Sequence, residues 1–285
     1  MITALEYRVK NEKLMKKYEE EVREWLYKKG AGEIAELIPF YRDGVTNPEL
    51  WFETGNDFRP LFILKEVSTG VDEIEGTDGR KGLKEYIKIW GYQKYFEFVS
   101  NPFDDVKIGT FSQWKRIAKL AKGMKEIHLG AESSDYNSHN FDFKSGGEIY
   151  TGNIEGYKDK NSYYERTANE DYNDIINRIA IMEIKKVGGG TYANSPISVA
   201  TGYYTEHIEP FKGLIEEQIN LIDPTVIICL GRECGCCTSQ LLAEIKENVG
   251  KRIWIDGYHH QFSSNEKFYY GPLNEYKKII KSKIE

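Results

Sequence analysis

The chain has few of the features that mark membrane, secreted or strongly DNA-binding proteins. Among its 285 residues no apolar run approaches membrane-spanning length, and the charged N-terminus MITALEYRVKNEKLMKKYEEEVREW lacks the apolar core of a signal peptide. The formal net charge is −6 and the pI is near 5.6, without the basic excess typical of nucleic-acid-binding surfaces. We therefore expect a cytoplasmic protein with no membrane partner.

Cysteine is scarce and confined to the single patch ICLGRECGCC. The four residues are Cys229, Cys234, Cys236 and Cys237. A disulfide framework would spread them along the chain, and a zinc or iron–sulfur site usually draws its ligands from separated segments. Cys229 lies in an apolar run, which is typical of a buried thiol. We expect reduced thiols, no metal and no cofactor.

The second half of the chain alternates between apolar strands and amphipathic helices. The predicted strands are Arg178–Ile184, Thr225–Gly231 and Arg252–Asp256, and the predicted helices are His207–Ile222, Thr238–Val249 and Leu273–Ile284. Continuous apolar strands that alternate with helices indicate a mainly parallel sheet covered on both faces. The expected fold is a three-layer α/β/α sandwich.

The first half contributes one strong strand and several helices to the same expected single domain, residues 1–285. An amphipathic helix is predicted over about residues 10–29, with Gly30 as a C-cap, and a buried strand over Leu61–Leu64. Further helices are predicted near Leu83–Val99 and Ser112–Lys122. A polar stretch rich in Tyr and Asn, about residues 133–174, is typical of a functional insertion.

Polar segments follow three predicted strands at their carboxyl ends. They read KEVSTG after Leu61–Leu64, KKVGGG after Arg178–Ile184 and GYHHQFSS after Arg252–Asp256. The carboxyl ends of parallel strands lie along one edge of the sheet, where α/β proteins bind ligands near a topological switch point. Each segment alone could be an ordinary surface loop, but their meeting at one edge predicts a pocket.

These segments resemble the uracil-DNA glycosylase superfamily. The resemblance is carried by PLFILKE, RIAIMEIKKVGGG, IEPFKGLIEEQINLIDPTVIICLG and YHHQFSS, in that order, and LIDPTVIICLG is its most specific piece. More narrowly, DGVTNPELWFE followed by LFILKEV is similar to a branch of uncharacterised bacterial proteins in that superfamily. The resemblance covers about Ile38–Gly70 and Asn177–Ser264, and the polar insertion lies outside it.

The resemblance implies a uracil-DNA-glycosylase-like fold and a hydrolase that releases a base from a nucleic acid or nucleoside. By position, Glu66 would orient water and support the sugar cation, and His259 or His260 would donate toward the leaving base. Consecutive glycines let backbone N–H groups converge on an anion. The residues that would hold phosphate or substrate are Lys65, Ser68, Lys185, Lys186, Gly188, Gly189, Gly190, Ser263 and Ser264. DNA or a nucleotide is thus the expected partner.

The chain departs from the family pattern at several of these positions. Classical members have Asp or Asn where Glu66 stands, and an asparagine before the lysine where this chain has Glu183. The last loop has no proline after its histidine. These departures keep open a second interpretation, a non-catalytic protein that binds a nucleotide or nucleic acid on the same fold.

A third interpretation comes from the sequence MEIKK. Glu183-x-Lys185 at the end of a strand matches half of a metal-dependent nuclease site, in which a carboxylate binds Mg²⁺ and the lysine orients water. Such a site needs a further aspartate, and Asp174 lies upstream. Dependence on a divalent metal would separate this activity from a glycosylase, which needs no metal.

Overall fold

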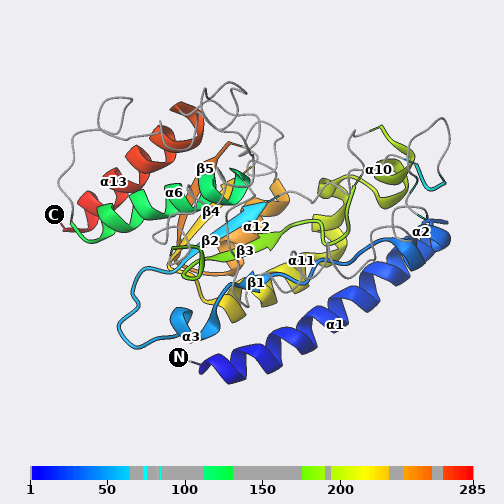
Figure 1. Ribbon diagram of the computed structural model, residues 1–285, viewed down its shortest axis with the longest axis horizontal. Coiled ribbons are helices and arrows are strands. Elements are labelled where there is room, and N and C mark those ends of the chain that lie inside the picture. Colours follow the sequence, from blue (N-terminus) through cyan, green and yellow to red (C-terminus); the bar gives the residue numbers. More distant parts are fainter. Residues whose placement is uncertain are drawn as a thin grey trace, which may run out of the picture.

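The computed structural model describes residues 2–64, 73–75, 82, 84, 112–130, 175–189, 194–230, 240–258 and 266–284. These residues form a five-stranded sheet with helices on both faces (Figure 1). The strands are β1 (Gly44–Val45), β2 (Pro60–Leu64), β3 (Ala180–Glu183), β4 (Val226–Leu230) and β5 (Ile253–Gly257). The helices are α1 (Ala4–Lys28), α2 (Gly32–Leu37), α3 (Pro48–Trp51), α6 (Ser112–His128), α10 (Pro196–Thr201), α11 (Tyr204–Ile222), α12 (Gln240–Asn248), the π-helix η4 (Glu266–Tyr270) and α13 (Gly271–Ile284).

The sheet is mainly parallel, as the apolar strand runs predicted. Its order is β1-β3-β2-β4-β5, with β3, β2, β4 and β5 parallel and the short β1 antiparallel at the edge. After β2 the chain forms β3, which pairs with one side of β2, and then crosses over to form β4, which pairs with the other side of β2. This reversal places the topological switch point between β2 and β4.

Alternate residues of each strand enter two separate cores. On β2, Leu61 and Ile63 pack in the core shared with α1, α11 and α12, whereas Phe62 and Leu64 pack in the core shared with α6 and α13. This alternation is the period-two geometry of a strand buried on both faces. Figure 1 shows α6 and α13 together on one side of the sheet, and α1 on the other. The mixed α/β prediction is confirmed, while the narrower glycosylase-like fold and the single domain stay predictions.

Helix α1 begins earlier than its apolar pattern predicts. Thr3 and Glu6 form a capping box: the Thr3 side chain accepts from the Glu6 N–H at 3.2 Å, and the Glu6 carboxylate accepts from the Thr3 N–H at 2.8 Å. This start signal, not apolar periodicity, sets the first turn. Gly30 follows the helix with φ of +79°, the left-handed conformation that favours glycine at this place.

Several short elements were not predicted from the sequence. Helices α3 and α10 begin with a proline, and the side chains of Asn47 and Ser195 cap them. Both sit in stretches rich in turn formers, which read as loops. Helix α6 extends to His128, beyond the predicted end at Lys122. The predicted helix near Leu83–Val99 and the polar insertion lie outside the described residues.

Candidate functional site

The four parallel strands end together at one edge of the sheet. Leu64 at the end of β2 lies opposite Glu183 of β3, and Leu230 of β4 lies opposite Gly257 of β5. The polar segments KEVSTG, KKVGGG and GYHHQFSS therefore start from, or just beyond, a common edge. The carboxyl edge of the sheet, on either side of the switch point, is the candidate functional site.

Many of the predicted site residues lie beyond the part of the chain that the structure describes. These are Lys65, Glu66, Ser68, Gly190, His259, His260, Ser263 and Ser264. Their predicted roles stay predictions. The described ones, Lys185, Lys186, Gly188 and Gly189, are all buried. Direct contact between these four residues and a phosphate therefore requires a rearrangement of the chain around them.

Lys186 forms a buried ion pair with Asp43, which precedes β1. The Lys186 Nζ donates to Asp43 Oδ1 at 2.5 Å, and the two side chains are 0% and 6% exposed. Gln218 of α11 donates to the same oxygen at 2.7 Å, and the Glu183 N–H donates to Asp43 Oδ2 at 2.6 Å. Burial lowers the pKa of Lys186, and the Asp43 carboxylate opposes that shift. The Lys186 ammonium is thus already engaged inside the protein.

The Lys186–Asp43 pair and neighbouring backbone contacts hold the start of the loop after β3. The Tyr41 N–H donates to the Lys186 carbonyl at 2.7 Å, and Phe40 forms an antiparallel bridge with Val187. Together with the Asp43 contact, these bonds attach the KKV segment to the chain that leads into β1. The glycines Gly188 and Gly189 therefore follow directly on a fixed backbone.

Close to Lys185, a buried neutral histidine lies at the start of α11. His207 Nε2 is 2.7 Å from the Thr201 carbonyl, so this nitrogen carries the proton, and the ring packs 4.6 Å from that of Trp25. Among the described residues Nδ1 has no hydrogen-bond partner. Burial lowers the pKa of His207 to about 3; Lys185 and Lys29 add to this effect, while the Thr201 carbonyl and Glu206 oppose it.

His207 gives the protein a predicted acid sensitivity. Below about pH 6.5 the unfolded chain binds a proton at this residue that the folded chain excludes, until the folded pKa of about 3 is reached. The free energy of unfolding should therefore fall by about 1.4 kcal/mol per pH unit in this window through His207 alone. Urea unfolding followed by circular dichroism, from about pH 8 to about pH 4, measures the slope.

His207→Gln is the matched variant for that measurement, because the glutamine amide can still donate to the Thr201 carbonyl. Other groups also titrate in acid, so the informative quantity is the difference between the two slopes. We expect a flatter pH dependence in the variant. Equal slopes in the two proteins would show that His207 does not resist protonation in the fold.

The structure describes only some of the residues of the predicted nuclease site. Glu183 is the last residue of β3 and Lys185 follows it by two positions; both are buried, and Asp174 is outside the described residues. Within the described ranges, no three His, Cys, Asp or Glu side chains cluster as metal ligands. Cys229 is a buried, reduced thiol, as predicted. The nuclease hypothesis stays a prediction.

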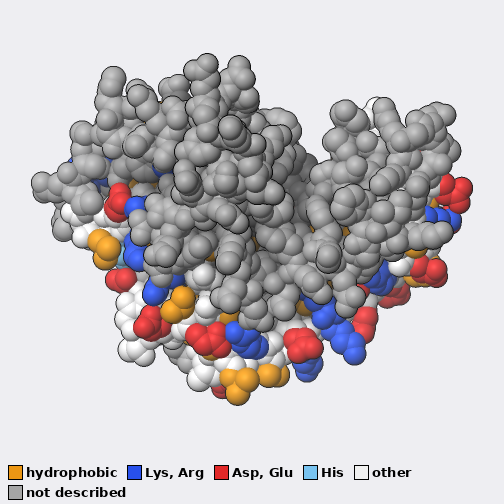
Figure 2. Space-filling model, viewed as in Figure 1, with side chains coloured by type: hydrophobic (Ala, Val, Ile, Leu, Met, Phe, Trp, Pro, Cys, Tyr) orange, Lys and Arg blue, Asp and Glu red, His pale blue; other side chains and the backbone are white. Residues whose placement is uncertain are grey.

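The outer face of α1 carries charges of both signs. Figure 2 shows Lys, Arg, Asp and Glu side chains interspersed along the lower rim, where α1 lies. Several are paired, as in Arg8–Glu49 at 2.7 Å and Lys28–Glu24 at 2.8 Å. This surface is therefore not a stripe of basic residues of the kind that binds a DNA backbone.

In the part of the chain that is described, no helix has the length and apolar character to cross a membrane.

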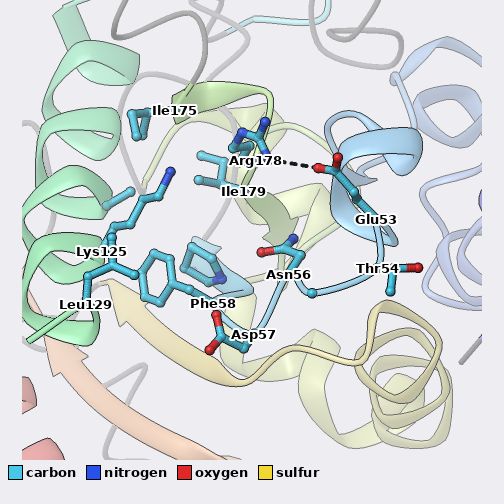
Figure 3. Close-up of a pocket in the computed structure, with 13 residues that line it drawn as sticks. Glu53, Thr54, Asn56, Asp57, Phe58, Lys125, Leu129, Ile175, Arg178 and Ile179 are labelled. Carbon is cyan, nitrogen blue, oxygen red and sulfur yellow. Dashed lines mark hydrogen bonds and ion pairs between the residues drawn. The ribbon is translucent and has the colours of Figure 1, made fainter.

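A pocket of about 250 Å³ lies at the opposite, amino-terminal edge of the sheet (Figure 3). Pro60 at the start of β2 and Ile179 just before β3 line it, with Lys125 from α6 and the loop Glu53–Phe58. Arg178 lines it too and pairs with Glu53 at 3.4 Å. No sequence pattern pointed to this pocket, and it is separate from the carboxyl edge.

Comparisons with protein-family models, curated proteins and solved structures found no match for this chain.

Proposed function

We propose that this protein hydrolyses an N-glycosidic bond in a nucleic acid or nucleoside at the carboxyl edge of the sheet. One observation carries the proposal: the parallel strands that precede KEVSTG, KKVGGG and GYHHQFSS end in register beside a switch point. Ligands of open α/β sheets bind at this place. The proposal also rests on the resemblance of these segments to the uracil-DNA glycosylase superfamily.

The residues that follow the strands fit the chemistry of base release. A carboxylate from Glu66, two positions after the end of β2 in the sequence, would orient the attacking water and support the cationic sugar. A histidine from the segment after β5, His259 or His260, would donate toward the negative charge that develops on the leaving base. Such an enzyme must first move the base out of the stack and hold it in a pocket.

The ion pair changes the role that we propose for Lys186. Because its ammonium is held by Asp43, Lys186 suits the anchoring of the loop after β3 better than contact with a phosphate. Anion contacts would then come from the backbone N–H groups of Gly188, Gly189 and Gly190, after a rearrangement of the chain that buries Gly188 and Gly189.

Release of free base from oligonucleotides tests the proposed function. The substrates are single- and double-stranded oligonucleotides with uracil or deaminated purines, and the matching nucleosides, with EDTA present throughout. We expect metal-independent release of at least one base with the strand left intact, detected by chromatography.

The other outcomes identify the rival functions. Strand cleavage that requires Mg²⁺ and disappears with EDTA would replace the glycosylase by the nuclease built on Glu183-x-Lys185. Tight binding of an oligonucleotide or nucleotide with no base released would replace it by the non-catalytic binding protein.

A further inference from the structure

The pocket at the amino-terminal edge of the sheet has a buried apolar floor. Phe58, Ile175 and Ile179 line it and are 8%, 8% and 1% exposed, and Pro60 and Ala121 complete this surface. The Phe58 ring packs against the His128 ring, with the two ring centroids 5.4 Å apart. His128 Nδ1 is in turn 3.0 Å from the Tyr276 hydroxyl. The floor is thus fixed by packing and suits a flat apolar group.

The charges of the lining residues Glu53, Asp57, Lys125 and Arg178 sum to zero, but Lys125 and Asp57 lie at opposite ends of the pocket. Glu53 pairs with Arg178 at 3.4 Å, and Asp57 lies 3.3 Å from His128 Nε2 with its carboxylate 77% exposed. Lys125 lines the pocket and forms no hydrogen bond or ion pair with any residue that is described. Figure 3 shows the Lys125 side chain extending toward the segment of Ile175 and Arg178, with Asp57 at the other end.

We propose that this pocket binds a small organic carboxylate with a compact aromatic or aliphatic body. The apolar body would lie on Phe58 and Ile179, and the carboxylate would lie at Lys125, near Arg178. A charge-assisted bond to a lysine or arginine is stronger than a neutral one. The volume of about 250 Å³ is below the range of drug-sized sites, so the ligand is small.

Titration with benzoate, with benzamide as its neutral counterpart, tests this site in the full-length protein. Amide chemical shifts report both affinity and location, and the measurement needs no catalytic activity, so its result is independent of the proposed glycosylase. We expect benzoate to bind with a Kd on the order of 1 mM or tighter. Its shifts should centre on Glu53–Phe58, Lys125 and Ile179, and benzamide should bind about tenfold more weakly.

Lys125→Met keeps the apolar stem and removes the charge, and should weaken benzoate binding about tenfold while leaving benzamide unchanged. Lys122→Met is the matched control, because Lys122 lies on the same helix but does not line the pocket. Equal affinity for benzoate and benzamide, equal loss in the two variants, or shifts elsewhere in the protein would each overturn the proposal.

Discussion

Changing Asp43 to asparagine is expected to lower the free energy of unfolding by about 3–5 kcal/mol. In the wild type the Lys186 side chain is 0% exposed and its ammonium lies 2.5 Å from the Asp43 carboxylate. The variant therefore leaves this buried ammonium against a neutral amide. An uncompensated buried charge costs far more than an exposed one. Urea unfolding near neutral pH measures the loss.

The control is a double-mutant cycle, which adds Lys186→Met and the double variant that combines it with Asp43→Asn. Lys186→Met should cost less than Asp43→Asn, because the remaining carboxylate still accepts from Gln218 and from the Glu183 N–H. The double variant removes both charges and should be more stable than the sum of the single losses implies. Additive losses would show that the pair does not interact in the folded protein.

Glu66→Gln is expected to lower the kcat of base release by about 10²–10⁴-fold. The amide keeps the size of the side chain but can neither take a proton from water nor balance a cationic sugar. Because the lost interaction forms only in the transition state, the KM should change little. His259→Ala should lower kcat by about 10²–10³-fold, the usual loss when one donor to a developing anion is removed. Single-turnover assays of base release measure both effects.

The matched control for the histidine is His260→Ala, the neighbouring residue on the same predicted loop. If one of the two histidines donates to the leaving base, one variant should lose most activity and the other little. A Glu66→Gln protein with wild-type kcat would contradict the assignment of Glu66 as the water-orienting carboxylate. Equal small losses in both histidine variants would contradict a donor in this segment.

The sheet was predictable because its strands are continuous apolar runs that end in polar residues. PLFIL and VIICL have the unbroken pattern of strands buried on both faces, and both are central strands of the sheet. The two-residue strand β1 was not predictable from its sequence. It pairs with β3 through Gly44 and Val45, and this pairing depends on contacts far along the chain.

The burial of the lysines in KKVGGG could not be read from the sequence. Two adjacent lysines before glycines are typical of a solvated turn, and their charge suggested a phosphate. In the structure Lys186 pairs with Asp43, to which Gln218 also donates, and Asp43 and Gln218 both come from segments distant from Lys186. One signal was present: Gln218 is a polar residue on the apolar face of α11, where it is fully buried.

The most direct test of the central claim is to locate the nucleic-acid contact on the protein. Amide chemical shifts are measured while a single-stranded oligonucleotide with a non-hydrolysable deoxyuridine analogue is added. We predict shifts at Leu64, Ile184–Gly189, Leu230 and Gly257, the ends of the parallel strands. Shifts confined to the amino-terminal edge or to α1, or no shifts at saturating oligonucleotide, would contradict a functional site at the carboxyl edge.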